Sequence, residues 1–98
     1  MESANSLPDK TLVARAQAGE RWAMDYLLRR HGPAMSRLAS RMLHGSPDAE
    51  DVLQEAYVRA FQALPSFRGN SAFSTWLYRI VVNACLMHAR KRARRFLL

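Results

Sequence analysis

Apolar residues recur at intervals of roughly three to four positions along almost the whole chain, with polar residues between them. This spacing is typical of amphipathic α-helices, and no stretch shows the sustained alternation of a half-buried strand. We therefore predict an all-α fold of about four helices. Their expected ranges are 10–18, 20–43, 47–64 and 72–95.

Local signals mark where these helices begin and end. Asp9, Ser46 and Ser71 are suitable N-cap residues, because a short side-chain oxygen can accept a free helix N–H. Gly19 and the His-Gly pair at 44–45 are typical helix stops. The connections between helices are therefore expected to be short.

Pro33 lies within the second apolar stripe. A proline removes one backbone donor and clashes with the preceding turn, so the helix must either bend or break there. The stripe resumes beyond it at Met35, Leu38 and Met42, which favours one helix kinked at Pro33.

The chain has 98 residues, enough for one small domain with a single modest core. We expect that domain over 9–95, after a flexible polar tail at 1–8 and before a truncated end at 96–98. The expected core positions of the last two helices are Leu53, Ala56, Tyr57, Ala60, Leu64, Phe73, Leu77, Ile80, Ala84 and Met87.

The composition indicates the cellular compartment in which the protein works. The single cysteine, Cys85, cannot form an internal disulfide, which fits a reducing compartment. No apolar run approaches the ~18 residues of a membrane helix, and the N-terminus lacks the basic and apolar regions of a secretory signal. We expect a cytoplasmic protein with no direct membrane insertion.

The sequence offers no candidate catalytic site or metal site. His31, His44 and His88 are scattered, and no cluster of His, Cys, Asp and Glu has the spacing of metal ligands. The pairing of Cys85 with His88 three residues later is weak and more typical of a structural feature. We expect no enzymatic activity, no cofactor and no metal.

The net charge of +7 is unevenly distributed. Residues 45–67 hold one Arg and four acids, whereas residues 68–98 hold seven Lys and Arg and no acid. An acid-free basic segment is a plausible footprint for a polyanion. The acidic segment instead suits a basic protein partner or simple solvation.

The acidic turn at 48–55 has two interpretations. Acids in a first helical turn suit the helix dipole, and most such turns have no further role. Val58 borders the same face and the rest of the chain is basic, which favours a partner surface.

One face of the last helix combines a ring, an amide and cations. By the 100° step of an α-helix, five side chains fall within about 60° of one another, and Thr75 flanks them. Such a face can stack a base, pair with a base edge and neutralise phosphates. The alternative is a solvated helix face with Trp76 half-buried. The five are Trp76, Arg79, Asn83, Arg90 and Arg94.

The loop at 66–71 follows Pro65 and leads into this helix. Gly69 permits a backbone turn that a side chain would hinder. Asn70, Ser71 and exposed amides suit an extruded base, but a plain helix connection with Phe67 in the core fits equally well.

Two motifs together resemble region 2 of the extracytoplasmic-function (ECF) group of sigma-70 family factors. Positions 48–61 read DAEDVLQEAYVRAF, and positions 67–80 read FRGNSAFSTWLYRI, followed by VNA. The opening LVARAQAGE at 12–20 fits more weakly. The resemblance covers about 9–95, and the combination in this order and spacing is highly specific.

The resemblance implies a compact helical sigma-2 domain that recognises and melts the promoter −10 element and holds a flipped base of the non-template strand. The implied DNA contacts are Phe67, Asn70, Ser71, Trp76, Tyr78, Arg79 and Asn83. We add Arg68 and Arg90 for their charge and Thr75 for its place beside the α-helical stripe.

The resemblance also implies two protein partners. The acidic helix would dock on the β′ clamp helices of the RNA polymerase core, and a membrane-linked anti-sigma factor would hold the protein inactive. The candidate polymerase contacts are Asp51, Gln54, Glu55, Val58 and Arg59.

The chain departs from the family pattern at Asn70, where an acid is common, and this change affects which base the loop accepts. The helix-turn-helix domain that reads the −35 element is absent, so we expect a fragment of a longer factor. The alternatives are a helical regulator that binds duplex DNA without polymerase and a purely protein-binding module. A duplex reader needs a recognition helix after a tight turn, unlike the longer loop here.

Overall fold

The structure is a computed structural model that describes residues 4–97. It contains four α-helices and two short 3₁₀ turns, η1 (Ala4–Ser6) and η2 (Leu64–Ser66), with no strand in the described range. The all-α prediction is therefore confirmed. The helices are α1 (Asp9–Gln17), α2 (Arg21–Met42), α3 (Ala49–Ala63) and α4 (Phe73–Leu97).

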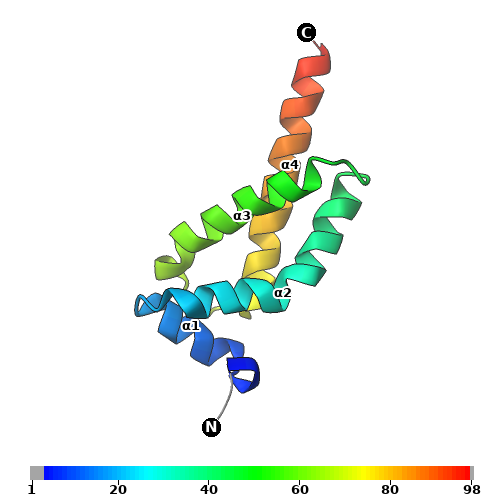
Figure 1. The fold of residues 1–98 in the computed structure, drawn as a ribbon. Helices are drawn as coiled ribbons and strands as arrows, with labels where there is room; N and C mark the ends of the chain where they lie inside the picture. The colour runs from blue at the N-terminus through cyan, green and yellow to red at the C-terminus, as the bar shows by residue number, and fades with distance from the viewer. Residues whose placement is uncertain (1–3, 98) are drawn as a thin grey trace.

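Each helix packs on its neighbours in the chain, and α4 also contacts α2. Figure 1 shows α4 crossing α3 and then extending beyond the other helices to the C-terminus. Up to Phe96, the last buried residue of α4 is Cys85, so residues 86–96 add no buried side chain to the core. The first three residues of the predicted tail and Leu98 lie outside the described residues.

The core forms where the apolar stripes of all four helices meet. On α4 the buried positions are Phe73, Leu77, Val81, Ala84 and Cys85. The predicted stripe was wrong at its end, because Met87 is 39% exposed. The predicted Ile80 is partly buried and packs against the core. A spacing of four residues from Phe73 turns the inward face toward Val81 and Cys85 instead.

The first helix ends as predicted at Gly19, whose φ of +97° is the left-handed conformation that glycine adopts freely. The Glu20 N–H donates to the Arg15 carbonyl and the Gly19 N–H to the Ala16 carbonyl, which is the Schellman arrangement. This turn reverses the chain so that α1 lies along α2.

Asp9 does not cap α1 as predicted, because the helix already begins at this residue and its side chain makes no cap bond. Its carboxylate instead accepts a hydrogen bond from Arg30 Nη1 at 2.9 Å and lies 2.8 Å from His31 Nε2. The charge thus links α1 to the middle of α2.

The second helix is continuous through Pro33, as predicted, and Figure 1 shows it bending in its middle. Proline has no N–H, so the Arg29 carbonyl lacks its usual intrahelical donor. Leu27 before the bend and Met35 and Leu38 after it are all buried. The bend therefore keeps both halves of α2 on the core.

The starts of α3 and α4 differ from the predictions. The Ser46 hydroxyl accepts the Asp48 N–H at 3.1 Å, but α3 begins at Ala49, two residues late. The Ser71 hydroxyl donates to the Ala72 carbonyl and caps no helix N–H, and α4 begins at Phe73. Ser71 belongs to the loop and not to the helix end.

Replacing the fully buried Leu77 by Ala should lower the free energy of unfolding by about 2–5 kcal/mol, because the truncation leaves a cavity where α4 meets the core. Urea denaturation followed by circular dichroism measures the loss. The matched control is Leu86→Ala on the same helix, whose side chain is 41% exposed and should cost less than about 1 kcal/mol. Equal losses in the two variants would contradict this core assignment.

Candidate nucleic-acid interface

The loop before α4 is anchored to α1 through one side chain. Gln17 Nε2 donates to the Phe67 carbonyl at 2.7 Å and to the Leu64 carbonyl at 3.1 Å. Beyond this anchor the chain turns at Gly69, whose φ is +75°. The start of the loop is therefore fixed, while Arg68, Gly69 and Asn70 at its tip are exposed.

An aromatic cluster lies under the loop. The Phe67 and Trp76 rings have centroids 5.0 Å apart, and both pack near the buried Phe73, at 6.4 Å and 5.6 Å. His31 of α2 contacts the other side of Phe73 at 5.6 Å. The two interpretations of Phe67 are thus compatible, because its half-buried ring packs on the core and also faces the loop.

A cavity of about 320 Å³ opens between the loop and the first turns of α4. Six of the ten predicted DNA-binding residues line it together with Ser66: Phe67, Arg68, Asn70, Ser71, Trp76 and Arg79. The cavity is within the volume range of ligand pockets, about 300–1,000 Å³. Its lining offers aromatic surface, amide and hydroxyl groups, and two guanidinium groups.

The other four predicted DNA-binding residues lie outside this cavity. Asn83 and Arg90 are exposed further along the same side of α4 as Arg79, at spacings of four and seven residues. Thr75 is exposed at the edge of that side. Tyr78 is 48% exposed but lies about 100° round the helix from Arg79, on a neighbouring side.

A second cavity, of about 650 Å³, lies on the opposite side of the loop against α1. Lys10, Val13 and Gln17 line it together with Gly69 and Ala72. The prediction missed Lys10 and Gln17, because their proximity to the loop spans some fifty residues of sequence, as the separation of 50 between Gln17 and Phe67 illustrates. The weak similarity at 12–20 was the only sign that α1 belongs near the site.

The five predicted polymerase contacts, Asp51, Gln54, Glu55, Val58 and Arg59, are all exposed on α3. Val58 is 56% exposed, which is high for a branched apolar side chain. Arg59 Nη1 lies 3.3 Å from the sulfur of Met87, so this face continues onto α4. Asp48 does not belong to it, because its carboxylate pairs with Arg92 at 3.1 Å and His88 at 3.3 Å on α4.

Two shifted pKa values belong to side chains outside the loop site. Burial raises the pKa of Tyr57, and the negative charge of Glu50 raises it further. The Tyr57 hydroxyl packs beside Gly32 at the bend of α2 and has no hydrogen-bond partner among the described residues. Burial also raises the pKa of the Cys85 thiol, which keeps it protonated and unreactive.

Within residues 4–97 no three His, Cys, Asp or Glu side chains are placed to hold a metal ion. No helix in this range is long and apolar enough to cross a membrane. The side chains that line the loop cavity can provide stacking, hydrogen bonding and charge neutralisation.

Comparison with known proteins identifies relatives that match most of the chain. The family model described as Sigma-70 region 2 matches residues 27–95. The RNA polymerase sigma-H factor of Pseudomonas aeruginosa is 44% identical over 89% of this chain and 45% of its own length. The ECF RNA polymerase sigma-E factor of Escherichia coli K12 is 45% identical over 91% of this chain and 46% of its own length.

Two solved structures share the fold. An engineered region 2 of sigmaE in complex with GTAAAA is 41% identical with a TM-score of 0.87, and the match covers 100% of both chains. CnrH in complex with the cytosolic domain of CnrY is 34% identical with a TM-score of 0.73, over 89% of this chain and 60% of that one.

The chain spans slightly less than half the length of the curated relatives, at 45% and 46% of the two named above. The family match nevertheless covers most of the chain and includes α3, the loop and α4. The chain belongs to the sigma-70 family and is a region 2 domain of the ECF type.

Proposed function

We propose that this domain recognises the promoter −10 element and opens it during transcription initiation. The single observation that carries the proposal is the cavity of about 320 Å³, where an aromatic cluster, polar loop side chains and two arginines meet. The similar engineered region 2 of sigmaE was solved in complex with GTAAAA, which supports a nucleic-acid ligand for this domain.

In this proposal a base of the non-template strand leaves the stack and enters the cavity. Phe67 and Trp76, whose ring centroids lie 5.0 Å apart, provide the aromatic surface on which the base stacks. Asn70 and Ser71 hydrogen-bond to the base edge, while Arg68 and Arg79 neutralise the flanking phosphates. The fixed backbone at Phe67 keeps the cavity formed before DNA arrives.

The strand then continues along α4. Asn83 and Arg90 follow Arg79 on the same side, and Thr75 borders it, so the backbone can follow the helix without meeting an acid. Tyr78 contacts DNA only where the strand bends round to the neighbouring side. The duplex-binding alternative has less support, because the connection from Leu64 to Ala72 is longer than the tight turn of a helix-turn-helix.

We also propose that the exposed α3 face of Asp51, Gln54, Glu55, Val58 and Arg59 binds the β′ clamp helices of the polymerase core in the cytoplasm. Exposed acids around one apolar side chain suit a basic partner surface. The acids attract the basic partner as it approaches, and Val58 packs against its surface once it is bound. An anti-sigma factor is the proposed inhibitor, and CnrH, a relative, was solved with the cytosolic domain of CnrY.

Replacing Trp76 by Ala should weaken binding of the GTAAAA strand about 5- to 150-fold, the loss that corresponds to one stacking contact of about 1–3 kcal/mol. Asn83→Ala, at an exposed position, should weaken it as well without affecting the fold. Fluorescence anisotropy measures the affinity, and circular dichroism verifies that each variant is folded. Folded variants that bind as tightly as the unmodified domain would exclude α4 from the DNA interface.

Replacing Asp51 by Arg should weaken binding to the polymerase core at least tenfold, because a cation then faces the basic partner. The matched control is Asp25→Arg, which reverses the charge of another exposed acid, on α2. Surface plasmon resonance with immobilised core enzyme measures both. The docking proposal fails if the two variants bind alike, and it can fail while the DNA proposal stands.

A further inference from the structure

A groove at the far end of α4 belongs neither to the loop site nor to the α3 face. It encloses about 510 Å³ between α4 and the connection that joins α2 to α3. His44, Ser46, His88 and Arg92 supply its polar edge. Its apolar lining consists of Met42, Leu43, Pro47, Ala89, Ala93 and Phe96.

The α4 wall of this groove has the form of a helix-packing surface. Ala89, Ala93 and Phe96 follow one another at spacings of four and three residues, so they lie along one side of the helix. The two alanines leave a shallow trough that another backbone can approach closely. Phe96 closes one end and is 80% exposed, so its ring has almost no cover within this chain.

The opposite wall is held in place by the turn after α2. His44 and Gly45 both adopt positive φ, +53° and +73°, and the Gly45 N–H donates to the Ser40 carbonyl at 2.8 Å. A left-handed histidine is uncommon and costs conformational energy that glycine would not. This turn buries Leu43 and leaves Pro47 exposed beside α4.

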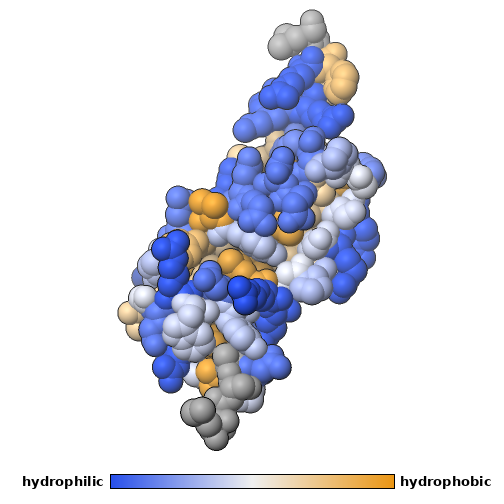
Figure 2. Space-filling view, in the orientation of Figure 1, coloured by the Kyte–Doolittle hydropathy of each residue, from blue (hydrophilic) through white to orange (hydrophobic). Residues whose placement is uncertain are grey.

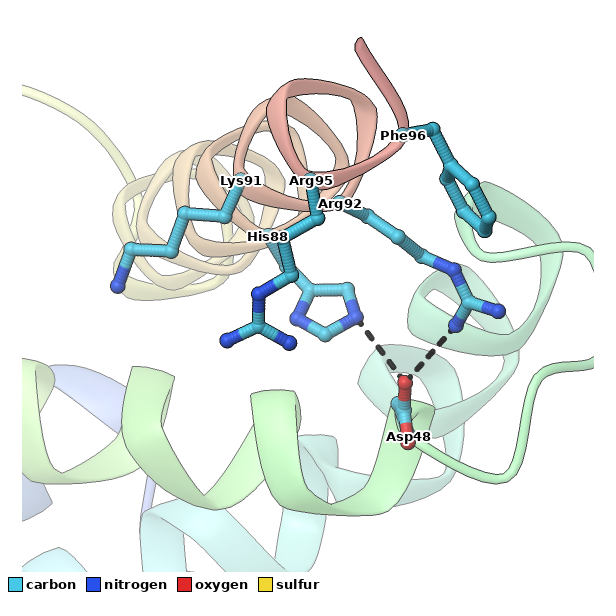
Figure 3. Close-up of a pocket in the computed structure, with 6 residues that line it drawn as sticks. All are labelled: Asp48, His88, Lys91, Arg92, Arg95 and Phe96. Carbon is cyan, nitrogen blue, oxygen red and sulfur yellow. Dashed lines mark hydrogen bonds and ion pairs between the residues drawn. The ribbon is translucent and has the colours of Figure 1, made fainter. Parts of the chain in front are cut away.

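Asp48 connects the two walls. Figure 3 shows its carboxylate facing both His88 and Arg92 of α4, at 3.3 Å and 3.1 Å. Arg92 separates the groove from a neighbouring cavity of about 360 Å³, where Lys91 and Arg95 project from α4. Among the described residues that line these two cavities, Asp48 is the only acid.

The surroundings of the groove therefore carry an excess of positive charge. The extended end of α4 is predominantly hydrophilic in Figure 2, and residues 68–98 contain seven cations and no acid. A second copy of α4 would bring the same cations against this surface and be repelled. Nucleic acid would match the charge but leave the apolar trough and Phe96 without a partner.

We infer that this groove binds a partner protein through an amphipathic helix whose apolar stripe is bordered by Asp and Glu. The eight residues from Ala89 to Phe96 rise by about 10 Å, which accommodates roughly two turns of a partner helix with anchors at i, i+3 or i+4, and i+7. The acids of the partner would face Arg92 and His88 at the polar edge of the groove. The inference goes beyond promoter recognition and does not depend on it.

The probe is a synthetic helical peptide with three leucines at i, i+4 and i+7 and glutamates on both flanks, compared with the same peptide carrying lysines. Binding to the ¹⁵N-labelled domain is followed by NMR. We expect the glutamate peptide alone to bind and to shift the amides of 42–48 and 88–96, while those of 66–71 stay in place. Its affinity should fall as salt rises.

Two variants should each weaken binding of the glutamate peptide at least tenfold. Phe96→Ala removes the aromatic anchor, and Ala93→Glu blocks the trough with an acid. Both positions are exposed, so the fold persists. The matched control is Phe61→Ala, which removes a phenylalanine on α3 that is 46% exposed. This variant should bind the peptide with the affinity of the unmodified domain.

Three results would overturn the inference: equal binding of the two peptides, affinity that neither groove variant changes, or amide shifts outside the groove. Self-association of the domain in sedimentation that Phe96→Ala abolishes would instead assign the groove to a second copy. Binding of GTAAAA by the same variants is measured in parallel. If the variants still bind GTAAAA, a negative result with the peptide counts against the groove inference alone and leaves the proposed promoter function standing.

Discussion

One uninterrupted 25-residue helix, α4, serves the core and the candidate interface together, and its pitch couples the two. Because Phe73, Leu77 and Val81 must face inward, the 3.6-residue repeat directs Trp76 and Arg79 outward beside the loop. A shift of one residue in how α4 packs would turn every outward side chain by about 100°. The precision of the interface is therefore a consequence of core packing.

The loop depends on a second constraint, which is local and polar. Gln17 binds the Phe67 carbonyl and shares the Leu64 carbonyl with the Phe67 N–H. It does so from α1, which is itself fixed by the Schellman turn at Gly19 and by the Asp9 contacts to α2. Removing the Gln17 amide would leave the Phe67 carbonyl to solvent and remove this link between the loop and α1. The loop is thus positioned by the part of the chain furthest from it in sequence.

Local chemistry could be predicted from the sequence, and long-range pairing could not. The stop at Gly19 and the continuity of α2 through Pro33 were predicted correctly because each depends on neighbouring residues. Asp9 and Ser71 were assigned as caps on propensity, but Arg30 and the Ala72 carbonyl bind them instead. For the candidate site, the loop and α4 residues were found because they are contiguous, whereas Gln17 reaches the loop only after folding. The α4 stripe was wrong at Met87, because this residue lies at the edge of the stripe, where a small turn of the helix decides burial.

The burial of the Cys85 thiol has a consequence for its oxidation. Cys85 is the chain's sole cysteine, it is 1% exposed, and burial raises its pKa, so the thiolate that reacts with peroxides or disulfides is scarce and shielded. In the folded domain, oxidation of Cys85 is therefore slow.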